Sequence, residues 1–168
     1  MLTLIEKNWL TLMFIAVSVF CYNNYGYARN ISSSLPHKNF FIVKNKNIKV
    51  GDYILFKAPK NSAYDGMFLI KQVLGGNGDK VAVKSCDVFI NDKLAATAKT
   101  HTKAGQPLTV ASDAQITNGS YFVVNAHQDS YDSRYLDFGL IHEKDISGVA
   151  YALWYRSGFK LRHIRANL

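Results

Sequence analysis

Three short fragments of this chain together hold the residue types that serine chemistry with a lysine base requires. They are Ser32–Pro36, Leu69–Val73 and Ser130–Tyr135. A serine hydroxyl is a weak nucleophile until a neighbouring group accepts its proton, and a lysine amine can do so once burial lowers its pKa. Each fragment is ordinary by itself, but their combination and order predict a Ser–Lys catalytic pair.

Lys71 is the candidate base because apolar residues surround it in the chain. In an alternating strand, Leu69, Lys71 and Val73 share one face. An amine held on an apolar face loses solvation, which lowers its pKa. The competing interpretation is an edge lysine that extends its amine to solvent.

Ser34 is the candidate nucleophile, since Leu35-Pro36 follows it and proline restricts the preceding residue to extended geometry. Ser32, two residues earlier, can direct its hydroxyl at an oxyanion. The alternative is a serine-rich linker. In the third fragment we expect Ser130 to aim the lysine amine, and Asp132 to pair with Arg134 and stiffen the loop. Taken alone, that fragment is an ordinary polar loop.

The N-terminal segment is hydrophobic and uncharged from Trp9 to Tyr22. A membrane-spanning helix needs about 20 apolar residues, and this run reaches that length only if flanking tyrosines extend it. We expect residues 1–29 to form an uncleaved signal anchor with Tyr22, Tyr25 and Tyr27 at the membrane interface. A cleaved secretory signal and a buried core helix are the alternatives.

Residues 30–168 are expected to form a single mostly-β domain of short strands behind that anchor, with a loop or insertion at about 95–115. Glycine, asparagine and aspartate turns separate runs rich in β-branched and aromatic residues. The predicted strands are Phe40–Val43, Tyr53–Phe56, Met67–Leu74, Lys80–Val83, Val88–Ile90, Tyr121–Asn125 and Gly148–Trp154.

Composition narrows the function classes. The formal net charge is +8, but the basic residues are scattered without a nucleic-acid reader motif. The densest group of basic residues lies within 156–165, and we interpret it as a solvated face in preference to a membrane contact. Two cysteines, Cys21 and Cys86, are too few for a disulfide framework. The 5 histidines show no ligand spacing, so no metal is expected.

The three fragments resemble the type I signal peptidases. The resemblance rests on Ser-Leu-Pro after a hydrophobic segment, on Leu-Ile-Lys-Gln-Val-Leu-Gly followed by Gly78-Asp79, and on Ser-Tyr-Asp-Ser-Arg-Tyr. Within that group the sequence looks closest to the conjugative-transfer, TraF-type peptidases that mature pilin precursors. The resemblance spans roughly residues 30–155 without the insertion.

The resemblance implies roles for six residues of the three fragments. Ser34 is the implied nucleophile and Lys71 the general base. Ser32 and the Ser34 amide are the implied oxyanion donors. The implied supporting residues are Ser130, Asp132 and Arg134. It also implies a mostly-β domain outside the cytoplasm on a single-pass anchor in the inner membrane, an exported, pilin-like precursor as partner, and no cofactor. Hydrolysis and pilin cyclisation both stay open.

The sequence departs from the family pattern at two places. Lys38 stands where TraF-type relatives usually carry glycine, and Asn125-Ala126 stands where Gly-Asp commonly opens the third motif. Both places are expected near the cleft, so they bear on substrate preference more than on the dyad.

Three other functions are weighed against the peptidase. A catalytically silent scaffold of a conjugative secretion apparatus would keep the fold, but the intact Ser34, Lys71 and Ser130 argue against it. A LexA-like self-cleaving repressor needs a DNA-binding domain before the serine, where only a short hydrophobic stretch stands. A basic nucleic-acid-binding barrel would show salt-dependent binding of single-stranded DNA, and a membrane anchor does not suit it.

Overall fold

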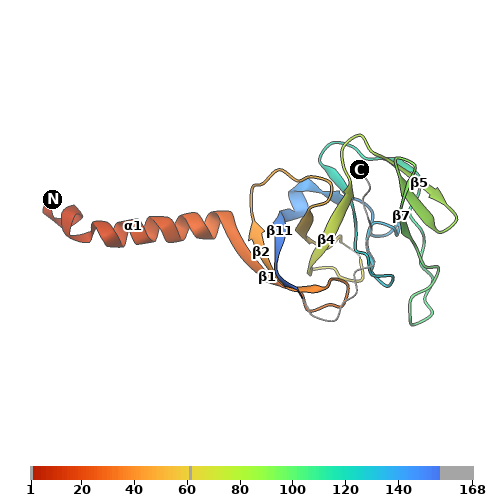
Figure 1. Cartoon of the computed structure of the whole chain (residues 1–168), viewed down its shortest axis with the longest axis horizontal. Helices are drawn as coiled ribbons and strands as arrows, with labels where there is room; N and C mark the ends of the chain where they lie inside the picture. Colours follow the sequence, from red (N-terminus) through yellow and green to blue (C-terminus); the bar gives the residue numbers. More distant parts are fainter. Residues whose placement is uncertain (1, 61, 156–168) are drawn as a thin grey trace.

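The computed structural model describes residues 2–60 and 62–155, so the basic group within 156–165 lies outside the described residues. The mostly-β fold is confirmed: one long helix precedes two antiparallel sheets (Figure 1). The elements are α1 (Leu2–Asn24), β1 (Tyr25–Arg29), β2 (His37–Val43), β3 (Tyr53–Lys57), β4 (Phe68–Gly75), β5 (Lys80–Lys84), β6 (Asp87–Ile90), β7 (Lys93–Thr97), β8 (Ala114–Gln115), β9 (Ser120–Val124), β10 (Ile141–His142), the 3₁₀ turn η1 (Glu143–Asp145) and β11 (Ile146–Tyr155).

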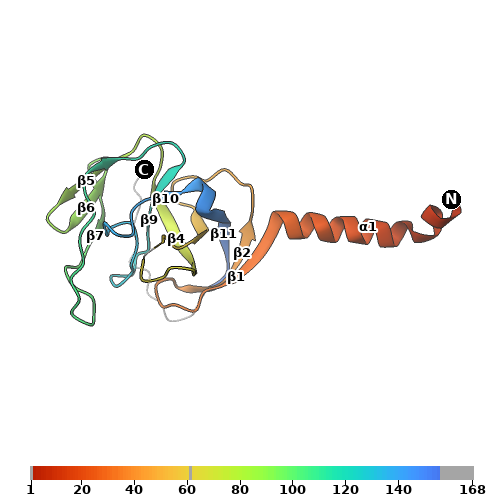
Figure 2. The ribbon, with the colours of Figure 1, turned by 180° about the vertical axis from the view of Figure 1, so that it is seen from behind.

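Helix α1 extends away from the β domain, with the N-terminus at its far end, as both Figure 1 and Figure 2 show. From Trp9 to Tyr22 the helix exposes most of its large apolar side chains, for example Phe14 at 71%. Among the described residues, no helix reaches the length and hydropathy that a membrane span requires.

The end of α1 is attached directly to the large sheet. The Lys44 backbone amide donates a hydrogen bond of 2.8 Å to Asn24 O, and the Lys44 Nζ donates one of 2.8 Å to Tyr22 O. The Tyr25 ring stacks on Phe41. The sequence places Tyr25–Arg29 in the N-terminal segment, whereas in the structure these residues form β1 and pair with β2. Pairing with a neighbouring strand, rather than local propensity, makes this glycine-containing segment a strand.

The large sheet has the strand order β1-β2-β11-β3-β4-β9-β10. Every predicted strand is present, with small differences at the ends. The long β11 pairs with both β2 and β3, and its register shifts between Ile146 and Gly148. Gly148 has φ +154°, and a Cβ there would lie 2.6 Å from Val43 O. The close approach of β11 to β2 therefore requires glycine at this position.

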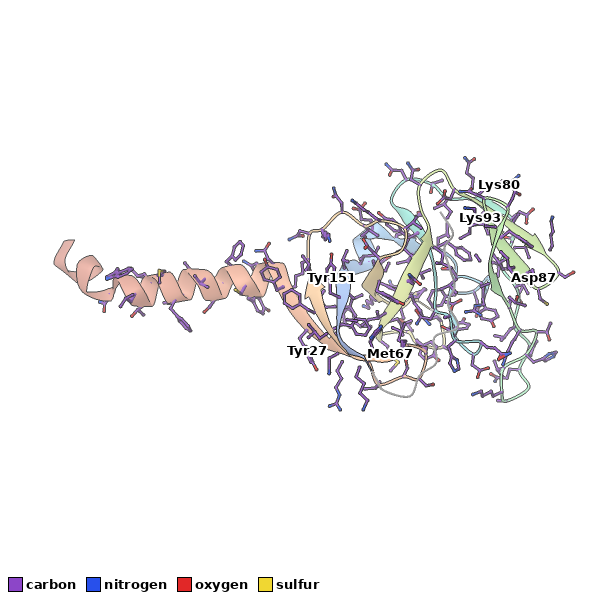
Figure 3. All side chains as sticks on the ribbon, in the orientation of Figure 1. Tyr27, Met67, Lys80, Asp87, Lys93 and Tyr151 are labelled. Carbon is purple, nitrogen blue, oxygen red and sulfur yellow. The ribbon has the colours of Figure 1, made fainter. Side chains whose placement is uncertain are left out.

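The second sheet has the order β7-β6-β5-β8 and lies at the end of the domain far from α1. Figure 3 shows Lys80, Asp87 and Lys93 on this sheet, whereas Tyr27 and Met67 lie on the large-sheet side. Its core residues Val81, Val88 and Ile90 pack with Phe122 and Val124 of β9. The apolar contact between the two sheets thus supports the strand that leads into the Ser130 loop.

The predicted loop at 95–115 is largely irregular, but strands occupy both of its ends. Lys93–Thr97 forms β7 and Ala114–Gln115 forms β8. Between them, His101 pairs with Pro107 in an isolated bridge, and Val110 pairs with Tyr135. The sequence did not predict these two short strands, because they contain few large apolar residues. Their hydrogen bonds come from pairing, of β7 with β6 and of β8 with β5.

Candidate active site

The turn between β1 and β2 carries the predicted nucleophile. Leu35 is buried in a core cluster with Phe40 and Ile42, which holds the turn against the sheet. The Asn30 side chain organises the polar side of the turn. Its Nδ2 donates to the backbone oxygens of Ser32, Leu35 and His37, and its Oδ1 accepts from the amide and hydroxyl of Ser32.

The half-buried Ser34 hydroxyl lies between two other polar side chains. Its Oγ is 2.8 Å from Ser32 Oγ and accepts a hydrogen bond of 3.3 Å from Asn125 Nδ2. Because the Ser32 hydroxyl already donates to Asn30 Oδ1 at 2.8 Å, the Ser34 hydroxyl is the donor between the two serines. Among the described residues no hydrogen bond joins Ser34 to Lys71. The Ser34 hydroxyl proton, which is directed at Ser32, must therefore turn toward the amine before it can be transferred.

Lys71 lies in the middle of β4, opposite Ile54 of β3, and its side chain is 5% exposed. The predicted sharing of one face is confirmed, since Val73 is buried on the same side of β4. Burial lowers the pKa of the Lys71 amine to about 8, while Asp132 opposes this shift and Arg134 adds to it. A pKa near 8 leaves about a tenth of the amine neutral at pH 7. A neutral amine can accept a proton.

Ser130 is the hydrogen-bond partner of this amine. Lys71 Nζ donates to Ser130 Oγ at 2.5 Å, and Ser130 is itself 2% exposed. The predicted contact between the two side chains is present although 59 positions separate them in the chain. A hydrogen bond from the amine to a buried hydroxyl oxygen fixes the direction of an otherwise flexible side chain.

Asp132 and Arg134 form the predicted pair below Ser130. Arg134 Nε and Nη2 donate to the two carboxylate oxygens of Asp132 at 2.7 and 2.9 Å. Arg134 also donates to Thr97 O and Asn125 O, and Asp132 accepts the Asn125 amide. Both side chains are almost fully buried. The pair joins the ends of β7 and β9 to the loop that carries Ser130, which gives the loop its rigidity.

A cleft of about 820 Å³ contains Ser34, Lys71 and Ser130 in its lining. One wall is apolar and aromatic, with Tyr64, Met67, Phe68, Leu69 and Tyr131. The lining also includes residues of the 99–108 loop, where Lys99 and Lys103 form ion pairs with Asp129. The three predicted fragments therefore meet at one open cavity.

The sequence analysis did not predict a role in the site for two of its residues. The sequence places Asn30 only at a polar boundary and marks Asn125 only as a departure near the cleft. In the structure Asn30 holds the Ser32–Leu35 turn, and Asn125 contacts Ser34 Oγ. Asparagine has no distinctive sequence signal, but Asn30 directly before a Ser-rich turn is typical of a side chain that bonds to the turn backbone.

Comparisons with known proteins identify the family of this chain. The family model described as signal peptidase, peptidase S26, matches residues 5–155 of the 168 in the chain. The chain belongs to the peptidase S26 family. Signal peptidase I V of Bacillus subtilis (strain 168) is 35% identical over 123 residues, which cover 66% of this chain and 69% of that protein.

This peptidase S26 chain is also similar to a solved structure, signal peptidase I from Enterococcus faecalis V583. The two share 24% sequence identity, with 62% of this chain and 97% of the other covered, at a TM-score of 0.39. Family membership makes this chain a serine-type signal peptidase. The closer likeness to the TraF-type branch stays a prediction.

Proposed function

We propose that this peptidase cleaves the signal or terminal peptide of an exported precursor through Ser34 and Lys71. The observation that carries the proposal is the buried Lys71 amine, with its pKa lowered to about 8, hydrogen-bonded to Ser130 in the cleft that also holds Ser34. Within the described part of the chain, the charged groups that influence this pKa are Asp132 and Arg134, and they act in opposite directions. Burial therefore keeps the base partly neutral near physiological pH.

The chemistry is acyl transfer in two steps. Ser34 Oγ attacks the scissile carbonyl while its proton passes to Lys71 Nζ, and Lys71 then gives that proton to the leaving amine. Ser32 and the Ser34 amide supply hydrogen bonds to the oxyanion, for which the Ser32 hydroxyl must leave Asn30 Oδ1. Water activated by Lys71 hydrolyses the ester and restores Ser34.

The Asp132–Arg134 pair and Ser130 act by holding Lys71 in place. The pair is bonded to Thr97 of β7 and to Asn125 just after β9, so the loop that carries Ser130 is held in place beside the amine. Fixed reacting groups avoid the entropy cost of assembling them at each turnover.

The substrate class is an extended peptide with small residues next to the scissile bond, added as a strand to the cleft edge. A pilin-like precursor of a conjugative system is the natural candidate, because Ser-Leu-Pro and Ser-Tyr-Asp-Ser-Arg-Tyr resemble the TraF-type fragments. If a substrate amine replaces water in the second step, the product is a cyclic pilin.

α1 is the proposed single-pass anchor in the inner membrane, with the peptidase domain on the extracytoplasmic side. The uncharged segment from Trp9 to Tyr22 exposes its large apolar side chains, and α1 extends away from the domain. Alkaline extraction of membranes tests the anchor. The wild-type chain should stay with the membrane, and a Phe14→Lys, Val17→Lys variant should be released.

The function is tested by the intact mass of an exported pilin precursor co-expressed with the wild-type chain or with Ser34→Ala. We expect the precursor to shorten only with the wild-type chain. A product one water lighter than the cut linear chain identifies cyclisation. Unchanged masses for a series of precursors, or equal processing by Ser34→Ala, would contradict the proposal.

A further inference from the structure

Asn125 lies at the junction of the two halves of the active site. Asn125 directly follows β9, and the last residue of β9, Val124, pairs with Gln72 of β4. Because the two strands are antiparallel, the next position of this register places Asn125 opposite Lys71. Its backbone amide donates to Asp132, and its backbone oxygen accepts from Arg134. The buried ion pair therefore holds the backbone of Asn125, while the Asn125 side chain contacts Ser34 on the turn between β1 and β2.

The orientation of the Asn125 amide follows from its partners. Nδ2 donates to Ile70 O at 3.1 Å and to Ser34 Oγ at 3.3 Å. A flipped amide would place Oδ1 against the carbonyl oxygen of Ile70, which has no hydrogen to donate. Ile70 therefore settles which end of the amide faces Ser34, and the hydroxyl oxygen of Ser34 is the acceptor.

The other end of the amide has no structural use. Asn125 is 1% exposed, and its Oδ1 is buried without a hydrogen-bond partner among the described residues. A buried acceptor without a donor typically costs about 1–3 kcal/mol, so the fold does not account for the Oδ1 end of this side chain. A residue that serves only the fold would use both ends of its amide, and this one uses only the end that faces Ser34.

We propose that Asn125 is a further catalytic residue, whose Nδ2 stabilises the negative charge that develops on Ser34 Oγ. The inference rests on the proposed role of Ser34 as nucleophile. When the Ser34 proton leaves for Lys71, the hydrogen bond from Nδ2 becomes charge-assisted and strengthens. It weakens when Oγ becomes the ester oxygen, and it strengthens again when Oγ departs during hydrolysis. The contact thus favours the transition states of both steps over the ground state.

The test compares full-length variants in detergent on a synthetic peptide with an Ala-x-Ala cleavage site. We expect Asn125→Ala to lower kcat about 10- to 100-fold and to leave KM within about threefold of wild type, because the lost contact is with the serine and not with the peptide. Ser120→Ala is the matched control. Ser120 is also buried and polar, but it lies at the opposite end of β9, bonded to His142.

The near-isosteric Asn125→Asp separates the proposed role from packing. A carboxylate keeps the shape of the amide but cannot donate to Ser34, so kcat should fall at least as far as in Asn125→Ala. Its charge beside Lys71 should also raise the pKa of the amine and move the acidic limb of the kcat/KM profile to higher pH. A purely structural role would tolerate this near-isosteric change, so kcat in Asn125→Asp would stay near the wild-type value. This variant also serves if Asn125→Ala does not fold.

The inference and the proposed function fail differently. If Ser34→Ala and Lys71→Ala are inactive but Asn125→Ala or Asn125→Asp keeps kcat within about threefold of wild type, the role of Asn125 is wrong and the dyad stands. A fall in kcat that Ser120→Ala reproduces equally also overturns the inference. If the wild type does not cut, or the Ser34 and Lys71 variants cut as well as the parent, the proposed function itself is wrong.

Discussion

The two halves of the active site differ in their exposure to solvent. On the side of the proposed base, Lys71, Ser130, Asp132 and Arg134 are all buried, and Arg134 donates hydrogen bonds to Thr97 of β7 and to Asn125 just after β9. On the nucleophile side, Ser32 and Ser33 are exposed and Ser34 is half-buried. A base needs desolvation to lose its proton, whereas a nucleophile must meet a substrate that arrives from solvent.

Because of this difference, substitutions in the two halves should differ in their effects on stability and on catalytic rate. Substitutions on the base side disturb buried charges and hydrogen bonds, so they act on both stability and rate. Substitutions on the nucleophile side remove contacts that water can replace in the free enzyme, so they act mainly on rate. Comparing the two halves by matched variants measures how far the site divides in this way.

The largest expected effect is on catalysis by the dyad itself. Ser34→Ala and Lys71→Met should each lower kcat by about 10³-fold or more, because each removes a group that forms or breaks bonds in the proposed mechanism. Their melting temperatures should differ: Ser34→Ala should melt with the wild type, and Lys71→Met at neutral pH should melt higher, since it relieves a buried amine. Normal cleavage by Lys71→Met would exclude Lys71 as the base.

Breaking the buried ion pair should give the largest loss of stability. Arg134→Ala leaves the fully buried Asp132 carboxylate without its partner, so we expect the free energy of unfolding to fall by about 3–5 kcal/mol. Lys103→Ala is the control, because its ion pair with Asp129 is exposed and should contribute less than about 1 kcal/mol. Equal losses in urea unfolding would contradict the contrast between buried and exposed pairs.

The lowered pKa of Lys71 predicts how stability depends on pH. The amine has a pKa of about 8 in the folded chain against an ordinary lysine pKa of 10.5, so between these pH values the unfolded chain binds the proton and the folded chain does not. Stability should therefore rise with pH across this window, by up to about 3 kcal/mol. Lys71→Met should lack this rise. Parallel curves for the two proteins in urea titrations from about pH 7 to pH 10.5 would refute the burial of a titrating amine.

Ser130→Ala should have an intermediate effect on rate. Loss of the hydroxyl that orients Lys71 should lower kcat about 10- to 100-fold while KM stays near the wild-type value. Because the variant leaves the amine in its buried place, the acidic limb of the pH–rate profile should stay near pH 8. A loss of activity that comes only from a higher KM would assign Ser130 to substrate binding instead.

The smallest effect is expected at Asn30, on the nucleophile side. Asn30→Ala removes the side chain that holds the Ser32–Leu35 turn, so we expect about a tenfold lower kcat with a stability loss of about 1 kcal/mol. Asn39→Ala is the control, since Asn39 accepts an exposed hydrogen bond from Tyr27 and lies outside the turn. A stability loss as large as that of Arg134→Ala would remove the distinction between the two halves.

Residue types and their order in the sequence determined much of this protein. The alternation around Lys71 predicted its face of β4, and the spacing of Asp132 and Arg134, two positions apart on one loop, predicted their pairing. Alternating patterns and short spacings are local, so they survive in the sequence without knowledge of the fold. The candidate serine and lysine were predicted from the three fragments together and from their resemblance to the type I signal peptidases.

Only the tertiary structure determined the pKa of Lys71 and the hydrogen-bond partners of Ser34. The pKa of Lys71 depends on how deeply β4 is buried, and the contact between Ser34 and Asn125 joins residues 91 positions apart. The direction of the Ser34 hydroxyl depends on Asn30, which holds Ser32. Desolvation and long-range contacts arise from strand register and from the packing of the two sheets, which no single fragment of sequence contains.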